Sequence, residues 1–180
     1  MTSFKVRRTE RRDIDTVAAV LADGKRSLAE LGISQWQWGD YPGSADVEVD
    51  VAEGISYLAE DRDGRVAATA ALSFAGDENY AAIEGAWLCD PEGPEVRYGT
   101  LHRTASSRAH ARQGAMKAIF LAAEDIARDR EALSLRVDTH PLNTPMRSLL
   151  ERLGYTECGV ITLAGDDPDP VRVAYEKPLT

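Results

Sequence analysis

The order of strand-like and helix-like segments constrains the fold of this 180-residue chain more than any other feature. Alternating apolar residues indicate strands, whereas apolar residues three and four positions apart indicate helices. The chain begins with a strand and continues with helices, three strands, a helix, a strand, a helix and two strands. This order predicts a mixed α/β fold around one sheet. The expected strands are 4–9, 55–61, 65–76, 97–106, 134–138, 156–165 and 171–177, and the expected helices are 13–32, a helix beginning within 108–120, and 143–155.

Three local patterns add detail to this order. Residues 13–32 carry apolar residues at helical spacing and end at Gly32, which predicts a helix and its stop. The turn sequence DRDG at 61–64 lies between two β-rich runs and predicts an antiparallel hairpin. Residues 44–54 open with Ser44 as a capping residue, but their alternation fits a strand as well as a helix.

Composition indicates a globular protein. Hydrophobic residues make up 43% of the chain and charged residues 28%, and no repeat or linker divides it, so we expect residues 1–180 to form a single domain. No apolar run approaches the roughly 18 residues that span a bilayer, and the start lacks the apolar core of a signal peptide. We therefore expect a cytoplasmic protein with no membrane partner. Cys89 and Cys158 lack metal-ligand spacing, so we interpret both as small core residues and expect no metal.

The net charge limits the partners. It is −9, from 30 acidic and 21 basic residues, which opposes attraction to nucleic acid. It mildly favours a cationic partner such as an amine, although an acidic surface also simply keeps a protein soluble.

The stretch RAHARQGAMKAIF, residues 108–120, places positive charge and a glycine where a helix begins. A helix N-terminus leaves backbone N–H groups unpaired and carries a partial positive charge, so it binds phosphate readily. A glycine there lets the phosphate approach the main chain. The stretch therefore predicts either an anion site or a plain helix start, with an apolar face formed by Ala115, Met116, Ile119 and Phe120.

Other motifs for phosphate and metal binding are absent from the sequence. It contains no G-x-x-x-x-G-K-[ST] and no G-x-G-x-x-G after a strand, so neither a P-loop nucleotidase nor a dinucleotide-binding Rossmann domain is supported. H-E-x-x-H and paired Cys/His spacings are also absent.

Two runs resemble the acetyl-CoA-binding half of the GNAT superfamily of N-acetyltransferases: LHRTASSRAHARQGAMKAIFLAAEDIA, which begins at Leu101, and SLRVDTHPLNTPMRSLLERLGY, which begins at Ser134. The QW…YP pattern in SQWQWGDYP and the DTH..N..M..LL...GY pattern resemble one bacterial subgroup. This resemblance implies a mostly antiparallel central sheet with splayed fourth and fifth strands, flanked by helices. It also implies acetyl-CoA as co-substrate and an amine of a small molecule or protein as acceptor.

The resemblance places the family's pyrophosphate loop, Arg/Gln-x-x-Gly-x-Gly/Ala, on residues 111–116, where only Gly114 matches. Ala111 replaces the first basic residue, although Arg108 and Arg112 stand nearby. Met116 replaces the last small residue and is expected to crowd a site of close packing. The implied cofactor-binding residues are main-chain groups of Thr104, Ala105 and Ser106, the loop and helix start Arg112, Gln113, Gly114, Ala115, Met116 and Lys117, and Asn143 at the next helix start.

Direct attack by an amine requires a base, because a lysine-like amine with a pKa of about 10.4 is protonated near neutrality. His102 lies in the strand that would border the thioester, and an ordinary histidine pKa of about 6.5 suits this task. Glu84 is the second expected catalytic residue. The alternative for His102 is a histidine that is simply packed in the sheet. The alternative for Glu84 is an acidic cap or surface residue before a short helical turn. Asp138 and His140 are also considered, but a loop-forming role is preferred for both.

The family's usual tyrosine acid falls on Leu150, so that tyrosine is absent. A thiol pKa of about 8.5 lets coenzyme A leave without full protonation.

The aromatic residues Trp36, Trp38 and Tyr41 lie where the family tends to border the acceptor. They would bind an amine through cation–π contacts of about 0.5–2 kcal/mol, or else cover the core. The departures at Ala111, Met116 and Leu150 leave a second function open, a non-catalytic sensor or regulatory module that binds CoA or acyl-CoA. An exposed strand in the closing pair would also allow a homodimer.

Overall fold

The computed structural model describes residues 3–89, 95–165 and 167–179, which form two compact units. Unit 1 combines Met1–Leu72 with His102–Ala123, and unit 2 combines Ser73–Leu101 with Glu124–Thr180. Neither unit is one continuous piece of the chain. The described residues contain eight strands, mostly antiparallel, together with helices, which confirms the predicted mixed α/β class. The single domain stays a prediction.

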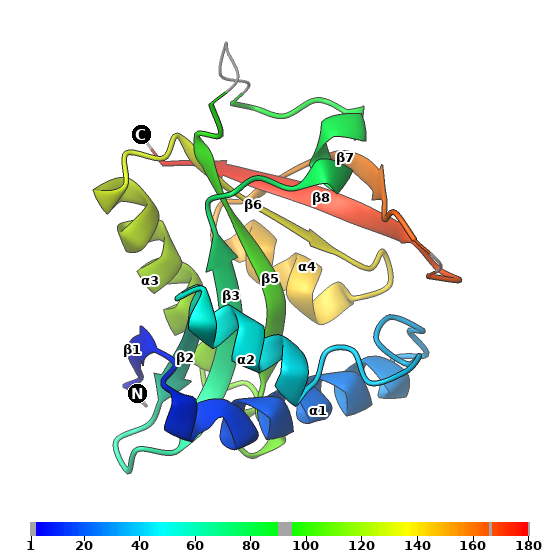
Figure 1. Cartoon of the computed structure of the whole chain (residues 1–180). Helices are drawn as coiled ribbons and strands as arrows, with labels where there is room; N and C mark the ends of the chain where they lie inside the picture. The colour runs from blue at the N-terminus through cyan, green and yellow to red at the C-terminus, as the bar shows by residue number, and fades with distance from the viewer. Residues whose placement is uncertain (1–2, 90–94, 166, 180) are drawn as a thin grey trace. The chain divides into compact units, whose positions relative to one another are not determined.

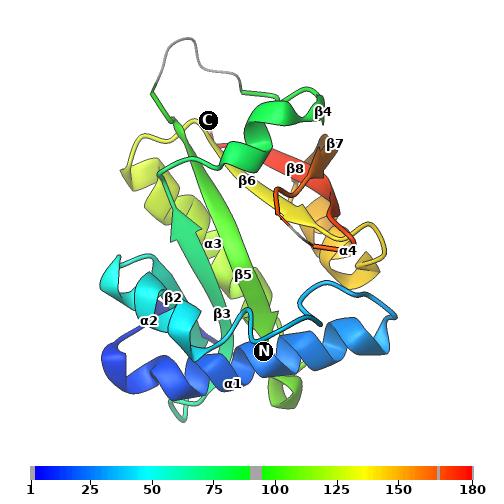
Figure 2. The same ribbon diagram turned by 45° about the vertical axis from the view of Figure 1, so that its right-hand side comes forward.

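Unit 1 is an antiparallel sheet covered by helices. Its strand order is β1-β2-β3-β5, and β2 pairs antiparallel with both β1 and β3. The helices α1 and α2 lie together on one face of the β2–β3 hairpin, and α3 begins on the other (Figures 1 and 2). The elements are β1 (Lys5–Arg8), η1 (Arg11–Asp13), α1 (Ile14–Glu30), α2 (Ser44–Ala52), β2 (Ser56–Glu60), β3 (Val66–Ser73), the second half of β5 (Tyr98–Ser106), η3 (Arg108–His110) and the first part of α3 (Ala115–Asp129).

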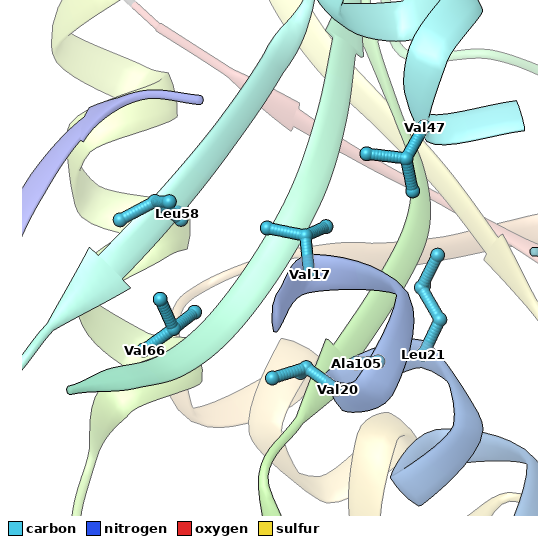
Figure 3. Close-up of a cluster of buried hydrophobic side chains, with 7 residues drawn as sticks. All are labelled: Val17, Val20, Leu21, Val47, Leu58, Val66 and Ala105. Atoms are coloured by element: carbon cyan, nitrogen blue, oxygen red, sulfur yellow. The ribbon is translucent and has the colours of Figure 1, made fainter. Parts of the chain in front are cut away.

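The core of unit 1 fixes the second half of β5 against α1. A Cβ atom on Gly24 would lie 2.8 Å from the Cβ of Ala105, so glycine permits this close approach of helix to strand. Each buried Val or Leu side chain contributes about 1.5–3 kcal/mol. Figure 3 shows the cluster, which consists of Val17, Val20, Leu21, Val47, Leu58, Val66 and Ala105.

The ambiguous segment 44–54 is helical as α2, and the prediction that Ser44 caps it is wrong. Gly43 is the capping residue and Ser44 is the first residue of the helix. The N–H of Gly43 donates to the Asp46 carboxylate at 2.8 Å, so a side chain inside the first turn closes the helix start. The hairpin predicted around residues 61–64 is confirmed by the antiparallel pairing of β2 and β3.

Unit 2 holds the remaining strands in the order β5-β6-β8-β7-β4. The parallel register of β5 and β6 runs from Tyr98↔Ser134 to Leu101↔Val137, and the other pairs are antiparallel. The helix α4 lies behind β6 in both views (Figures 1 and 2). The elements are the first half of β5, η2 (Glu78–Ala82), β4 (Glu84–Gly85), β6 (Ser134–Thr139), α4 (Thr144–Arg152), β7 (Thr156–Thr162) and β8 (Val171–Pro178).

A buried ion pair stabilises unit 2. The Glu176 carboxylate accepts hydrogen bonds from Ser134 Oγ at 2.5 Å and from Arg136 Nε at 2.9 Å. The Arg136 guanidinium lies 4.1 Å from the ring centroid of Trp87 and 3.9 Å from that of Tyr98. The hydrogen bonds and ring contacts of this buried charge pair offset the free-energy cost of removing its charges from water. The pair also holds the segment before residue 90 against β6 and β8.

Cys89 and Cys158 are both free and only half-buried, so the prediction of core residues holds in part. Burial raises the pKa of both thiols. Within residues 3–89, 95–165 and 167–179, no group of three or more His, Cys, Asp or Glu side chains is arranged to hold a metal ion. No helix in the same ranges has the length and apolar character to cross a bilayer.

Candidate active site

The second half of β5 carries the residues predicted to border the thioester. Arg103 has a φ of +48°, so a left-handed residue interrupts the extended strand immediately before Thr104. The Ala105 side chain belongs to the core, which leaves only the main chain of this residue for a ligand. His102, Thr104 and Ser106 are half-buried.

Arg103 links β5 to α2 and to the segment between α1 and α2. Its Nε and Nη2 atoms donate to the two carboxylate oxygens of Asp50 at 2.8 and 2.5 Å, and Nη1 donates to the Tyr41 hydroxyl at 3.3 Å. Burial of Arg103 favours the neutral form, but the hydrogen bonds to Asp50 and Tyr41 outweigh it and raise the pKa above its ordinary value. The guanidinium therefore stays charged and positions Tyr41. No local spacing in the sequence indicates this contact.

The three aromatic residues predicted to bind the acceptor differ in exposure. Trp38 is 65% exposed and Tyr41 is 47% exposed. Trp36 is half-buried, and its ring lies 3.4 Å from the position that a Cβ on Gly24 of α1 would take. Trp36 therefore packs against α1, as its core-covering alternative predicted, whereas Trp38 and Tyr41 offer aromatic surface to a ligand.

The start of α3 presents unpaired backbone donors. The first hydrogen bond of the helix runs from the N–H of Ala118 to the carbonyl of Gly114, so the N–H groups of residues 115–117 have no acceptor within the helix. Gly114 has a φ of +93°, and a Cβ atom added to it would meet nothing within 4 Å. This helix start has no capping side chain at Gly114 and is open to an approaching anion.

Two cations accompany this helix start, and Arg108 is not one of them. The Arg108 guanidinium binds Glu30 of α1 at 2.6 Å, and its backbone N–H donates to Asp23 at 2.9 Å. Arg112 and Lys117 are exposed, and among the described residues neither side chain has a hydrogen bond or an ion pair. Arg112, rather than Arg108, is therefore placed to replace the basic residue missing at Ala111.

The expected crowding by Met116 stays a prediction. Met116 is 9% exposed, and the apolar face predicted for this helix is confirmed, since Ala115, Ile119 and Phe120 are also buried. Its side chain belongs to that buried face, which removes it from the exposed surface formed by Gly114 and Lys117.

Glu84 and Asp138 of unit 2 occupy strands. Glu84 is exposed in β4, opposite Val160 of β7. The short helix η2 precedes Glu84, so the expected place of this residue before a helical turn is wrong. Asp138 accepts a hydrogen bond from the hydroxyl of Tyr80 at 2.8 Å. Burial and the nearby Asp138 carboxylate raise the pKa of Tyr80.

His140 has a loop-forming role, as predicted. Its side chain is 6% exposed, and its Nε2 lies 2.8 Å from a carboxylate oxygen of Asp169. Its Nδ1 accepts from the N–H of Leu142 at 3.1 Å, so Nε2 carries the proton and donates to Asp169. Both ring nitrogens are engaged within the protein, which leaves none to accept a proton from a substrate.

Asn143 caps α4. Its Oδ1 accepts from the N–H of Met146 at 3.3 Å, and its Nδ2 donates to Thr139 Oγ1 at 3.0 Å. These bonds give Asn143 a structural role, and its contact with the cofactor stays a prediction. Leu150, which stands at the position of the family's tyrosine acid, is fully buried in the same helix.

Comparisons with known proteins agree with this fold. Residues 27–155 match the model of the acetyltransferase (GNAT) family. No curated protein matches the chain in sequence. The crystal structure of a GNAT family acetyltransferase from Streptococcus agalactiae 2603 is 32% identical, with a TM-score of 0.83 over 97% of this chain and 95% of that chain.

Two more distant structures share the fold. An acetyltransferase of the GNAT family from Listeria monocytogenes is 20% identical, with a TM-score of 0.70 over 97% of this chain and 94% of that one. The ribosomal-protein-S18-alanine N-acetyltransferase from Escherichia coli is 14% identical, with a TM-score of 0.67 over 99% of this chain and 95% of the other.

Proposed function

Because the chain belongs to the GNAT acetyltransferase family, we propose that it transfers an acetyl group from acetyl-CoA to an amine of a small molecule or a protein. One observation carries this proposal beyond the family: the start of α3 at Gly114, where the N–H groups of residues 115–117 have no acceptor within the helix and Arg112 and Lys117 are exposed. An unpaired helix start with two cations suits a diphosphate.

The diphosphate of acetyl-CoA would accept hydrogen bonds from the N–H groups of Ala115, Met116 and Lys117. Each charge-assisted hydrogen bond is worth about 1.5–3 kcal/mol, so a few of them suffice without a P-loop lysine. Arg112 and Lys117 add charge, and Gln113 closes the turn through a bond from its Nε2 to the Ala109 carbonyl at 3.2 Å. The pantetheine amides would pair with the main chain of residues 104–106, as an added strand does.

In the reaction, the acceptor nitrogen attacks the acetyl carbon, a C–N bond forms, the C–S bond breaks and sulfur leaves as the thiolate. We assign His102 to remove the proton of the ammonium group, with Glu84 as the second candidate. A backbone N–H near Thr104, beside the left-handed Arg103, would polarise the carbonyl. Because a thiol pKa of about 8.5 makes the thiolate a good leaving group, the reaction tolerates Leu150 in place of an acid.

The acceptor is a cationic amine under this proposal. Trp38 and Tyr41 offer exposed ring faces for cation–π contacts, and the net charge of −9 favours a cation. The proposal places the protein in the cytoplasm, with no nucleic-acid or membrane partner, and it allows a homodimer.

One observation favours a second function, a CoA-binding sensor without turnover. Leu150 is fully buried at the position of the family's acid, so α4 offers no proton donor there. The two functions share the α3 start and differ only in the chemical step.

The test combines calorimetric titration of acetyl-CoA with thiol release in the presence of a panel of amines and peptides. The proposal predicts micromolar binding and release that depends on the amine. His102→Gln should lower kcat at least about 100-fold and leave the Kd of acetyl-CoA unchanged, and Glu84→Gln tests the second base in the same assay. Binding without release for the whole panel supports the sensor. Absence of binding contradicts both functions.

A further inference from the structure

His110 holds the chain immediately before the exposed loop 111–114. It is the last residue of η3, and its side chain is 11% exposed. Its Nε2 lies 3.0 Å from Asp61 Oδ2, and the Phe4 ring meets it edge-on with 6.3 Å between ring centroids. Its carbonyl accepts from the N–H of Gln113 at 3.3 Å. The ring of His110 is therefore fixed by the turn after β2 and by the N-terminal segment, and its main chain is bonded to the loop.

Asp61 is itself held rigidly in the turn between β2 and β3. Its Oδ1 accepts from the backbone N–H groups of Asp63 and Arg65, each at 2.9 Å, which leaves Oδ2 for His110. The hydrogen bonds from Arg65 and His110 lower the pKa of Asp61, so this carboxylate is ionised near neutral pH and Nε2 of His110 acts as the donor. The position of the His110 ring therefore depends on the conformation of the turn between β2 and β3.

The imidazole has no other polar contact. Its Nδ1 is buried and, among the described residues, has no hydrogen-bond partner. The ring therefore contributes one hydrogen bond, to Asp61, and packs against Phe4. Its location beside the loop distinguishes it from His102 of β5, which we assign to proton transfer.

The loop needs such an anchor because its own residues are exposed and conformationally unusual. Arg112 and Gly114 both have positive φ, at +59° and +93°, and residues 111–114 are exposed. The N–H of Ser107 donates to Ala67 of β3 at 2.8 Å, but this bond lies on the far side of η3 from the loop. Arg108 ties the start of η3 to α1, and the Gln113 side chain bonds back to the Ala109 carbonyl. His110 adds the side-chain contact to the turn after β2 that lies directly before the loop, and losing it would widen the range of conformations that the loop samples.

We infer that His110, through its hydrogen bond to Asp61, is a positioning residue that holds loop 111–114 in the conformation that binds the diphosphate of acetyl-CoA. The inference rests on the proposed function. Because Ala111 lacks the basic side chain of the family, affinity depends on backbone N–H groups, and these bind tightly only when they are preorganised.

The experiment compares two ligands that differ in the diphosphate. Acetyl-CoA carries it, whereas S-acetylpantetheine keeps the thioester and the pantetheine arm but lacks it. His110→Leu removes the hydrogen bond and keeps an apolar side chain, whereas His110→Gln retains an N–H donor. Calorimetry gives the Kd of acetyl-CoA, and the ligand dependence of the melting temperature gives the Kd of the weaker S-acetylpantetheine.

We expect His110→Leu to weaken acetyl-CoA binding about tenfold and to leave S-acetylpantetheine binding within twofold, with His110→Gln restoring most of the loss. His140→Leu is the matched control, since it removes the histidine of another part-buried His–Asp pair of the described residues, in unit 2. It should leave the ratio of the two Kd values unchanged.

Equal weakening of both ligands, or unchanged binding of acetyl-CoA, would overturn the inference. If the wild-type protein binds neither ligand, the proposed function itself fails. Wild-type binding that His110→Leu leaves intact counts against the positioning role alone.

Discussion

The starts of α3 and α4 differ in how their backbone donors are satisfied. At α4 the Asn143 side chain accepts from the N–H of Met146 at 3.3 Å, so one donor is already used. At α3 the capping position is Gly114, which has no side chain to accept a hydrogen bond. Arg112 and Lys117 flank α3 and are exposed. The first turn of α4 carries Arg147, whose guanidinium is bonded to the Tyr175 hydroxyl, the Pro141 carbonyl and the Glu157 carboxylate.

Under the proposed function, this difference makes the start of α3 the anion site, because its donors are left for a ligand. Both starts are conspicuous in the sequence, and Asn143 is the more polar of the two. Its polarity serves the helix itself, because an asparagine cap is worth about 1 kcal/mol of stability. The less polar Gly114 leaves its donors for a ligand.

Giving α3 an acidic side chain at its start should remove the difference and have the largest effect. Gly114→Asp places a carboxylate where the diphosphate would bind, so both hydrogen-bond competition and charge repulsion oppose the ligand. We expect the Kd of acetyl-CoA, measured by calorimetry, to rise at least about 100-fold.

Gly32→Asp is the matched control for backbone strain. Gly32 also has a positive φ, +72°, with open space around it, but it lies at the end of α1. A similar loss of affinity in this control would show that strain rather than the helix start is responsible.

Removing the two flanking cations should weaken binding by a smaller factor. The Arg112→Ala and Lys117→Ala double variant keeps the backbone donors, so we expect the Kd of acetyl-CoA to rise about tenfold and to depend less on salt. Arg108→Ala is the control, because its guanidinium is already paired with Glu30. An equal effect of Arg108→Ala would contradict the assignment of Arg112 and Lys117.

Removing the cap of α4 should affect stability rather than binding. We expect Asn143→Ala to lower the free energy of unfolding by about 1 kcal/mol in urea denaturation. Asn143→Ser, which retains a capping oxygen, should recover most of this loss. A rise in the Kd of acetyl-CoA comparable to that of Gly114→Asp would instead establish Asn143 as a cofactor residue.

The two helix starts should also respond differently to pH. Burial alone would raise the pKa of Asp23, but hydrogen bonds from the Arg108 N–H and the Arg26 guanidinium lower it below its ordinary value of 3.8. A lowered folded-state pKa stabilises the fold above the ordinary value and loses that contribution as pH falls through the folded value. The chain before α3 therefore depends on an ionised Asp23, whereas Asn143 and Thr139 do not titrate.

We expect the difference in unfolding free energy between wild type and Asp23→Asn to be largest near about pH 6 and to shrink toward about pH 3. The difference for Asn143→Ala should stay constant over the same range. Denaturation curves at several pH values give both quantities, and a constant difference for Asp23→Asn would show that its carboxylate contributes nothing to stability.

The sequence predicts most elements because their signals are local. The helix α1 follows from apolar spacing and Gly32, and the β2–β3 hairpin follows from the turn before Arg65. The burial of Met116 confirms its place on the apolar face, and the crowding expected from its size stays a prediction. The sequence does not predict strand β4, because a strand of two residues is too short to show an alternating pattern of apolar residues.

The part of the candidate site that the sequence does not predict depends on contacts between residues far apart in the chain. The pairing of Arg103 with Asp50 and of His110 with Asp61 joins residues 53 and 49 positions apart. The Arg108 side chain is likewise directed away from the loop by its bond to the distant residue Glu30. No spacing within one element encodes such contacts, whereas the glycine that opens α3 is visible in the sequence.

The most direct test of the account follows the backbone amide signals of the ¹⁵N-labelled protein during titration with acetyl-CoA. The account predicts large shifts for Ala115, Met116 and Lys117 at the start of α3, and little change for Met146, whose N–H is already bonded to Asn143. Shifts at Met146 with none at residues 115–117, or no shifts at either helix start, would contradict it.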